Sequence, residues 1–454
     1  MDTADITRLR LAQKEYFLEH QTIPVSSRRS YLKILLDVLD LYEDRILDAL
    51  YTDLGKSPTE GFMSEVGMVR QEIHYMLKNT RRLARQKYTS TPLHEFPALS
   101  ETIRIPYGNV LVIAPWNYPF MLSLTPLVDA IAAGNTVILK PSAYAPATSQ
   151  ILAEVVAAAF PPELATVIQG GRAENQALMD EPFDYIFFTG SKAVGHVVME
   201  KAAKNLVPFS LELGGKSPTV VDETANLALS AKRIVFGKFL NAGQTCVAPD
   251  YVLVHESVHE CFMQALLHEV EKQYGDPATI GKIINQKHFD RLCGLIEPDK
   301  VVYGGEAAQN TLQIAPTIMD NVSWDAPVMQ EEIFGPVLPV LTYESFEETM
   351  AKLQSMPTPL AFYLFSRDKV RQEFIKKVQP FGSGCINDTI VQLTNDHLPF
   401  GGMGASGIGQ YHGEYGFNTF SHTKAILEKG TLDLPMRYAN APAWQQKLIR
   451  LILK

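Results

Sequence analysis

The chain has 454 residues, of which 46% are hydrophobic and 20% are charged, a composition typical of a folded globular protein of two or three domains. The net charge of −9 and the lack of any basic block argue against a nucleic-acid partner. The charged N-terminus has no signal-peptide core, and no uncharged apolar run reaches the roughly 18 residues of a membrane span. We therefore expect a cytoplasmic protein without a membrane anchor.

Residues 1–88 predict helices, because apolar side chains recur at intervals of three and four, as in RRSYLKILLDVLDLYEDRILDALYTDLG. The segment PLHEFPALSETIRIPYGNV, with its prolines, interrupts this pattern and indicates a loop or hairpin. From NVLVIAP to FSLELGG, short apolar strands alternate with amphipathic helices, and a second alternating stretch runs from about 217 to about 399. Such alternation predicts a parallel sheet covered on both faces, which binds ligands at the carboxyl ends of its strands.

Polar or glycine-rich turns follow several of these strands: WNYP (116–119), KPS (140–142), TGSKAVG (189–195) and ELGGKSP (212–218). A glycine turn that leads into a helix N-terminus suits a phosphate group, and glycine lets the backbone approach a ligand closely. The spacing of Gly190 and Gly195 lacks the tighter dinucleotide pattern and the ending of a P-loop. Simple packing of helix on strand therefore remains an alternative at this turn.

Cys246 lies in LNAGQTCVAPDYVLV (240–254), after small and polar residues and before a strand-like run. Buried structural cysteines usually lie among apolar residues, so this position indicates a sulfur that a reactant can reach. The other cysteines, Cys261, Cys293 and Cys385, read as structural thiols. The four are too scattered for a disulfide framework, and the histidines lack ligand spacing, so no metal is expected.

Seven segments resemble, in the correct order, the aldehyde dehydrogenase superfamily: PWNYPF, LKPS, FTGSKAVG, LELGGKSP, NAGQTC, QEEIFGPVL and LPFGGMGASGIGQYHGEYGFNTFSHTKA. The last segment and the short N-terminus are most similar to the class 3 branch, which includes fatty aldehyde dehydrogenases. The resemblance implies an α/β aldehyde dehydrogenase fold with a Rossmann-like parallel sheet. It implies an NAD(P)-binding domain (1–84 and 106–213), a catalytic domain (214–420), and a bridging or oligomerisation element made of a β-hairpin and tail (85–105 and 421–454).

The resemblance also implies the chemistry, which is oxidation of an aldehyde to a carboxylic acid with NAD or NADP. Cys246 forms a thiohemiacetal and then a thioester, because a thiolate is a strong nucleophile. The amide of Asn117 and the backbone N–H of Cys246 stabilise the oxyanion, and Glu212 activates the hydrolytic water. Without the family, Asn117 reads as a turn residue and Glu212 as a solvated strand end.

The same resemblance implies that Lys140 contacts the adenosine ribose, while Gly190 and Ser191 approach the pyrophosphate and Gly195 allows close helix packing. Glu332 and Phe334 hold the nicotinamide ribose and back the ring. The full set of expected cofactor residues is Trp116, Lys140, Ser142, Gly190, Ser191, Gly195, Glu332 and Phe334.

One position departs from the family pattern. Many aldehyde dehydrogenases carry a glutamate three residues after the lysine that corresponds to Lys140, and its carboxylate repels a 2′-phosphate. Here that position is Ala143, and no arginine stands in the same turn. We therefore expect both cofactors to work, with NADP at least comparable to NAD.

Tyr118, Phe236 and Leu240 are expected to line an apolar substrate channel, which favours medium-chain aliphatic or aromatic aldehydes over acetaldehyde; they also fit an ordinary core. A homodimer is implied by the branch, and WQQKLIRLILK at the C-terminus reads as a packed amphipathic helix. Two alternatives remain: an esterase or acyl transferase that uses the same cysteine without redox chemistry, and a non-enzymatic protein that keeps the fold.

Overall fold

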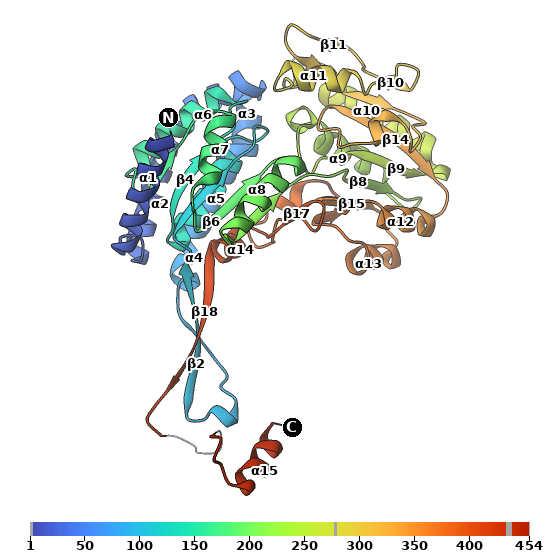
Figure 1. Ribbon diagram of the computed structural model, residues 1–454. Coiled ribbons are helices and arrows are strands. Elements are labelled where there is room, and N and C mark those ends of the chain that lie inside the picture. Colours follow the sequence, from blue (N-terminus) through green and yellow to red (C-terminus); the bar gives the residue numbers. More distant parts are fainter. Residues whose placement is uncertain (1–2, 277–278, 433–437, 454) are drawn as a thin grey trace.

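The computed structural model describes residues 3–276, 279–432 and 438–453. Within these ranges the chain forms two α/β units that lie side by side, and a long arm that projects away from them (Figure 1). The alternation of strands and helices expected from the sequence is confirmed in both units. The helical reading of the first residues is also confirmed, because helices occupy most of 3–83.

The first unit contains a six-stranded sheet among the described residues, in the order β17-β7-β6-β3-β4-β5, and all neighbours are parallel except β17 with β7. The strands are β3 (Asn109–Ile113), β4 (Thr136–Lys140), β5 (Ala165–Val167), β6 (Tyr185–Thr189), β7 (Phe209–Glu212) and β17 (Gly407–Ile408). The strands β3, β4 and β6 are buried at every position. This is why they read as continuous apolar runs rather than as alternating ones.

Helices cover both faces of this sheet. One face packs against α1 (Thr3–Leu18), α7 (Arg172–Asp180) and α8 (Lys192–Lys204) through a core that includes Ile6, Leu178 and Val198. The helices on the other face are α2 (Val25–Leu54), α4 (Gly67–Leu83), α5 (Met121–Ala133), α6 (Pro146–Ala159) and α14 (Gly413–Thr419). Between α2 and α4 run the short helix α3 (Pro58–Gly61) and a π-helical turn, η1 (Phe62–Val66).

The second unit contains a seven-stranded sheet within the described ranges, in the order β10-β13-β14-β9-β8-β15-β16. The strands are β8 (Pro218–Val221), β9 (Tyr251–His255), β10 (Val301–Tyr303), β13 (Thr317–Met319), β14 (Val337–Tyr343), β15 (Ala361–Phe365) and β16 (Ser383–Ile386). Its helices are α9 (Leu227–Phe239), α10 (His259–Tyr274), α11 (Gln286–Cys293), α12 (Phe346–Ser355) and α13 (Lys369–Lys377), and β11 (Ala307–Ala308) pairs with β12 (Gln313–Ile314). The chain then returns to the first unit, where β17 pairs with β7.

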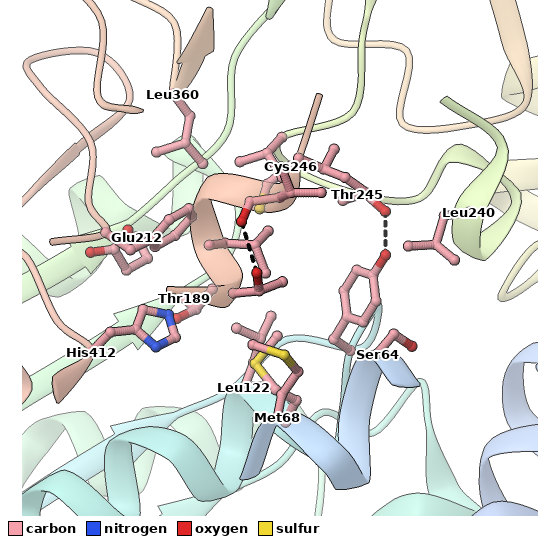
Figure 2. Close-up of a pocket in the computed structure, with 18 of the residues that line it drawn as sticks. Ser64, Met68, Leu122, Thr189, Glu212, Leu240, Thr245, Cys246, Leu360 and His412 are labelled. Atoms are coloured by element: carbon pink, nitrogen blue, oxygen red, sulfur yellow. Dashed lines mark hydrogen bonds between the residues drawn. The ribbon is translucent and has the colours of Figure 1, made fainter. Parts of the chain in front are cut away.

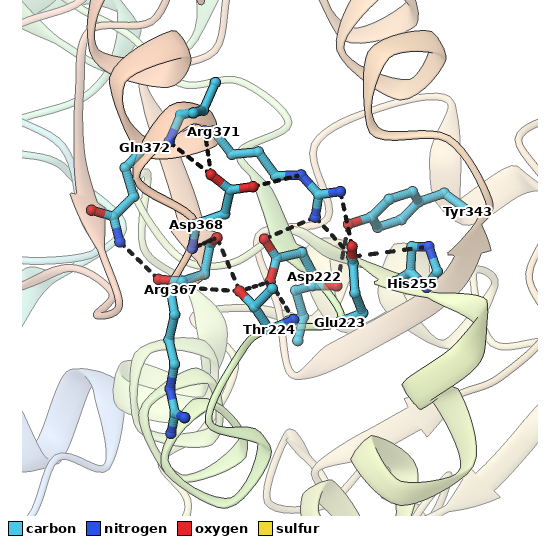
Figure 3. A network of polar contacts seen from close by, with 12 residues as sticks. Asp222, Glu223, Thr224, His255, Tyr343, Arg367, Asp368, Arg371 and Gln372 are labelled. Atoms are coloured by element: carbon cyan, nitrogen blue, oxygen red, sulfur yellow. Dashed lines mark hydrogen bonds and ion pairs between the residues drawn. The ribbon is translucent and has the colours of Figure 1, made fainter.

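A polar network ties α13 to the end of β8 in the second unit (Figure 3). The Arg371 guanidinium lies 3.1 Å from Asp222 Oδ2 and 2.7 Å from Glu223 Oε2. Asp222 is fully buried, and Asp368 caps α13 by accepting from the backbone N–H of Val370 and of Arg371. Burial of an unpaired carboxylate would be costly, so Arg371 holds this corner of the unit together.

The arm is a three-stranded antiparallel sheet, β1 (Lys87–Thr89), β2 (Ala98–Pro106) and β18 (Ser421–Lys429). β1 and β2 form a hairpin, so of the loop or hairpin expected for 92–110 the hairpin is confirmed, and β18 pairs with β2 along its whole length, from Ser421 opposite Pro106 to Lys429 opposite Ala98. The helix α15 (Ala443–Ile452) lies at the far end (Figure 1).

The expectation that the C-terminal helix is packed is wrong for one of its faces. Gln445 is buried, whereas Trp444 and Leu451 are 63% and 68% exposed. The helix contacts the short turn η2 (Leu93–Glu95) at the arm's tip, and among the described residues nothing covers Trp444 or Leu451 on its outer face.

Candidate active site

The carboxyl ends of the parallel strands in the first sheet meet at one edge. In the register of the sheet, Ile113 of β3 stands opposite Lys140 of β4 and Phe188 of β6, and Thr189 of β6 stands opposite Glu212 of β7. The polar and glycine-rich turns that follow these strands (116–119, 140–142, 189–195 and 212–218) therefore lie beside one another. This is the edge at which open α/β sheets bind ligands.

The turn that carries Cys246 is held by one glutamine. The helix α9 ends at Phe239, so Leu240 begins a short 3-10 turn, η3 (Leu240–Gly243), in which Asn241 and Ala242 have positive φ. Gln244 Nε2 donates to the backbone oxygens of Asn241 (3.1 Å) and Lys282 (3.0 Å), and Gln244 Oε1 accepts from the backbone N–H of Ile284 (3.0 Å). These bonds fix a conformation that non-glycine residues rarely adopt.

Cys246 and Glu212 line the same cavity, of about 210 Å³. In Figure 2, Glu212 and His412 lie on one side of the cavity and Leu240 on the other, with Met68 and Leu122 across from Cys246. Tyr118, Phe236 and Leu240, the residues expected to line a substrate channel, all contribute to the wall. The remaining wall is mostly apolar and includes Met63, Met121, Val247, Leu360, Ile390, Leu393, Phe400 and Tyr411.

The carboxyl of Glu212 is isolated. The residue is 2% exposed, and neither side-chain oxygen has a hydrogen-bond partner among the described residues. Burial raises the pKa of Glu212 well above its usual range, because a charge without solvent or partners is unfavourable in a low dielectric. A carboxylate in this setting is a much stronger base than one in water.

The surroundings of Cys246 favour the neutral thiol. Burial raises the pKa of Cys246 to about 12, and the negative charges of Glu332 and Glu212 act in the same direction. The backbone N–H groups of Cys246 and Val247 partly oppose this shift, because they face the sulfur.

Asn117 is placed between the two units. Its Nδ2 donates to the backbone oxygen of Gln244 (3.0 Å), within the turn of the cysteine. Its own backbone oxygen accepts from Asn241 Nδ2 (2.7 Å) and from Lys56 Nζ (3.1 Å). A carboxamide has two N–H groups, so one remains after the bond to Gln244. Asn117 is 3% exposed and lies outside the wall of the cavity.

Lys140 is buried at the end of β4. Its Nζ donates to the backbone oxygens of Pro141 (2.8 Å) and Gly170 (2.7 Å). Burial lowers the pKa of Lys140 to about 8, and the nearby negative charge of Glu174 opposes that change. Ser142 follows on the same turn, and its Oγ accepts from the backbone N–H of Tyr144 (3.2 Å).

The glycines at the start of α8 permit close approach. The backbone N–H of Gly190 donates to the backbone oxygen of Glu212 (3.0 Å), and Ser191 caps α8 by accepting from the backbone N–H of Val194. A methyl group at Gly195 would come within 3.0 Å of Leu213. The role expected for Gly195, close packing of the helix, agrees with this contact.

Glu332, Phe334 and Trp116 gather where the two units meet. Burial raises the pKa of Glu332 to about 8, with a smaller contribution from Asp250. A methyl group at Gly214 would overlap the Glu332 carboxylate. Phe334 has a positive φ, and its ring meets that of Trp116 edge to face at 5.3 Å.

These residues fit a dinucleotide. The edge offers a glycine turn with a helix N-terminus for the phosphates, a buried lysine for the ribose and an aromatic pair beside a carboxylate. Close contacts with neighbouring side chains occur at Gly190, Gly195 and Gly214, where a methyl group would lie within 3.0 Å of Phe188, Leu213 and Glu332 respectively.

Comparison with known proteins decides the family. Residues 1–426 match the sequence profile of the "Aldehyde dehydrogenase family". The chain belongs to the aldehyde dehydrogenase family. It is 46% identical over 424 residues to the 4,4'-diaponeurosporen-aldehyde dehydrogenase of Staphylococcus aureus, covering 92% of each protein, and 42% identical to the Arabidopsis thaliana aldehyde dehydrogenase family 3 member H1, covering 94% of this chain and 89% of that one.

Solved structures agree with this assignment. A substrate-bound Staphylococcus aureus AldH superposes with a TM-score of 0.96 at 44% identity, covering 99% of each chain. An Escherichia coli NADP-dependent enzyme (TM-score 0.86, 28% identity, 93% of this chain and 90% of that one) and a Mycobacterium tuberculosis aldehyde dehydrogenase complexed with NAD+ (TM-score 0.85, 28% identity, 95% and 92%) share the fold.

This aldehyde dehydrogenase therefore oxidises aldehydes and uses NAD or NADP. The class 3 resemblance is confirmed by the family 3 relatives, and the esterase alternative is not favoured. Within the described residues no group of three or more His, Cys, Asp or Glu side chains is arranged to hold a metal ion. None of the described helices is long and apolar enough to cross a membrane.

Some residues of this aldehyde dehydrogenase site could not be found from the sequence. Lys56 and Glu65 form a fully buried ion pair (2.6 Å), and Lys56 Nζ lies 3.9 Å from the centre of the Tyr118 ring. Tyr118 in turn shares a 2.6 Å hydrogen bond with Thr245, next to the cysteine. In sequence, Lys56 and Glu65 are ordinary charges in a helical segment, and nothing marks them as a pair.

His412 is a second such residue. It lines the cavity, its ring stacks on Tyr411 (4.2 Å between centroids), and its Nδ1 lies 3.6 Å from Glu72 Oε2. The motif QYHGEYGF indicated the family but assigned no role to the histidine.

Proposed function

We propose that Cys246 is the nucleophile that receives the aldehyde. The support is a single observation: Cys246 shares one buried, mostly apolar cavity with Glu212, an unpartnered carboxyl. The sulfur bonds to the carbonyl carbon and the thiol proton passes to the oxygen, which gives a thiohemiacetal. When bound, NAD or NADP would supply the acceptor for the hydride of this adduct, and water would take the hydroxyl proton, so that a thioester would remain on Cys246.

Glu212 is proposed to activate the water that hydrolyses the thioester. As the water oxygen bonds to the acyl carbon, one of its protons passes to Glu212 and the carbon–sulfur bond breaks. The thiolate then takes up a proton and the carboxylic acid leaves. The raised pKa of Glu212 supports this role, because it makes the carboxylate a stronger base.

Asn117 and the backbone N–H of Cys246 are proposed to donate to the oxyanion of the tetrahedral adducts. Such donors are each worth about 3 kcal/mol in the transition state. The bond from Asn117 to Gln244 supports this role, since it holds the amide against the turn of the cysteine and leaves a second N–H available.

The cofactor is proposed to lie along the strand ends. Lys140 and Ser142 would contact the adenosine ribose, and the turn from Gly190 to Gly195, with Ser191, would take the pyrophosphate. Glu332 would hold the nicotinamide ribose, with Phe334 and Trp116 beside the ring. Two contacts support placing the nicotinamide end here: the Glu332 carboxylate lies close to Gly214, and the rings of Trp116 and Phe334 meet edge to face.

Two variants test the catalytic roles. Cys246→Ala should abolish aldehyde oxidation and still bind NAD, whereas the control Cys261→Ala, at an exposed position of α10, should keep full activity. Glu212→Gln should release one equivalent of reduced cofactor and then stall as a thioester. Intact-mass measurement that finds no acyl-enzyme during the stall would refute the role of Glu212, and oxidation by Cys246→Ala would refute the nucleophile.

The preferred substrates are proposed to be medium-chain aliphatic or aromatic aldehydes. Tyr118, Phe236 and Leu240, together with the methionines and leucines of the wall, give the cavity an apolar lining that supports this choice. An aldehyde with a longer apolar chain would bury more surface there.

We also propose that the protein is a cytoplasmic homodimer. Each chain would have the three regions expected from the sequence: a cofactor-binding domain (1–84 and 106–213), a catalytic domain (214–420) and a bridging element (85–105 and 421–454). The arm supports a dimer, because it projects from the body and exposes large apolar side chains such as Tyr88, Leu99 and Leu427. Leu99→Lys should weaken the dimer in sedimentation equilibrium, whereas Leu41→Lys, at an exposed site on α2, should not. A monomeric wild-type protein would contradict the proposal.

The four cysteines, all unpaired, are compatible with a reducing compartment.

A further inference from the structure

The adenosine end of the cofactor site has an unusual charge pattern. This inference rests on the proposed contact between Lys140 and the adenosine ribose. Ala143, three residues after Lys140, is exposed and carries no charge. The turn that follows Lys140 therefore has no charge of its own to read the 2′ position of the ribose, and the charges that read it must come from elsewhere in the fold.

A second turn lies directly beside the first. The strands β4 and β5 are parallel neighbours, with Leu139 opposite Val167. As a result, Lys140 Nζ reaches the backbone oxygen of Gly170 at 2.7 Å, and Gln169 Nε2 donates to Gln150 Oε1 of α6 at 3.1 Å. The turn that leads into α7 is thus joined to both the lysine and the helix after it.

This second turn carries two opposite charges, Arg172 and Glu174. Glu174 Oε2 accepts from the backbone N–H of Gly171 (2.7 Å). The backbone N–H groups of Glu174 and Gly171 lower the pKa of Glu174, and the positive charge of Lys140 adds a smaller contribution. The carboxylate is therefore ionised, and its charge is partly neutralised.

Arg172 is exposed and makes no hydrogen bond or ion pair within the part of the chain that the structure describes. It is the first residue of α7, two residues after the carbonyl that Lys140 holds. Two Cα steps span about 7 Å at most, which is within reach of an arginine side chain. Next to it, a side chain at Gly171 would meet no atom within 4 Å, so the space beside the turn is open.

The other charged groups around this turn are already engaged or neutral. Asp53 accepts from the backbone N–H groups of Ala147 and Thr148 at the start of α6. Glu154 of α6 pairs with Arg45. Burial lowers the pKa of His288, whose ring lies 6.5 Å from that of Tyr144. Of the three charges at the two turns, Lys140 and Glu174 bond only to backbone groups, and Arg172 has no partner among the described residues.

We propose that Arg172 and Glu174 decide how this enzyme reads the 2′ position of the adenosine ribose: the Arg172 guanidinium binds the 2′-phosphate of NADP, and the Glu174 carboxylate opposes it. A guanidinium matches phosphate geometry with paired donors and keeps its charge at any working pH. Glu174 is already bonded to Gly171 and lies near Lys140, so the net field at the turn is positive. NADP therefore binds at least as well as NAD, through a cation that comes from the neighbouring turn.

The test measures binding of NAD and NADP to the intact enzyme by calorimetry, without aldehyde, so that no turnover is needed. Arg172→Gln should weaken NADP binding about tenfold or more, since a charge-assisted hydrogen bond is lost, and change NAD less than about twofold. Glu174→Gln, which can still accept from Gly171, should strengthen NADP binding severalfold and leave NAD unchanged. Arg81→Gln, an exposed arginine on α4, is the matched control and should change neither.

Lys140→Met distinguishes the placement of the ribose at Lys140 from the roles of Arg172 and Glu174 at the 2′ position. If it weakens both cofactors while Arg172→Gln leaves NADP binding unchanged, the roles given to the second turn are wrong and the placement of the ribose stands. If Lys140→Met weakens neither cofactor, the ribose lies elsewhere and the inference is overturned together with that placement. Loss of NADP binding in Arg172→Gln, with the opposite change in Glu174→Gln, supports the proposal.

Discussion

The apolar cavity makes a quantitative prediction about substrate length. In Figure 2, Cys246 lies between Glu212 on one side of the cavity and Leu240 on the other. A short aldehyde bound to the sulfur fills only the space near Cys246, whereas a longer chain extends along the apolar wall. Each buried methylene contributes about 0.8 kcal/mol, or a factor of about four in kcat/KM. From acetaldehyde to octanal, complete burial would give roughly three and a half orders of magnitude, which is an upper limit for an open cavity.

Leu240→Ala sharpens the test, because Leu240 lines the cavity on the side opposite Glu212 and has no proposed role in the chemistry. We expect a loss of about tenfold in kcat/KM for octanal, or about 1.4 kcal/mol, and little change for acetaldehyde. Leu229→Ala, a leucine on the outer side of the same helical segment and 38% exposed, is the matched control. The assay follows reduced cofactor at 340 nm across a series of straight-chain aldehydes.

Two results would refute this reasoning. A series in which kcat/KM is flat or falls from acetaldehyde to octanal would show that the chain does not bind along this wall. A Leu240→Ala variant that loses the same factor for every aldehyde would show that Leu240 supports the cysteine turn instead of contacting the chain.

Three further predictions concern stability and the cofactor site. Asp129 is fully buried without a hydrogen-bond partner among the described residues, and burial and Glu72 raise its pKa. The stability that this carboxyl contributes to the wild type is therefore present at low pH and lost as the pH rises through the raised pKa. The melting temperature of Asp129→Asn relative to wild type should rise between pH 5 and pH 9, and a constant difference would contradict this. Arg371→Leu leaves Asp222 buried without its guanidinium partner and should lower the free energy of unfolding by about 3 kcal/mol in urea titration; an unchanged midpoint would rule that out. Gly214→Ala should displace the Glu332 carboxylate and weaken cofactor binding about tenfold or more, with an unchanged melting temperature; unchanged affinity would argue against the role of Glu332.

Much of the fold can be read from the sequence, because its signals are local. Continuous apolar strands between amphipathic helices predict parallel sheets, and the described strands β3, β4 and β6 are buried at every position. The setting of Cys246 among small and polar residues indicates a reactive thiol without any tertiary information. Glu212, Lys140 and Gly190 lie at strand ends, where a parallel sheet brings its turns together. The strand positions depend only on residue type and periodicity along the chain, whereas the roles expected for Glu212, Lys140 and Gly190 follow from the resemblance to the aldehyde dehydrogenase family.

Tertiary structure alone decides which turns become neighbours and how each charge is paired. The sequence does not indicate that Lys56 faces Glu65 and Tyr118, that His412 reaches the cavity, or that Gly170 receives the Lys140 ammonium. No arginine stands in the turn of Ala143, and Arg172 is close to that turn only through the pairing of β4 with β5. The pKa values of Cys246 and Glu212 also depend on burial and on charges distant in sequence. Solvation and Coulomb energies depend on distances in space, and the order of residues along the chain does not specify those distances.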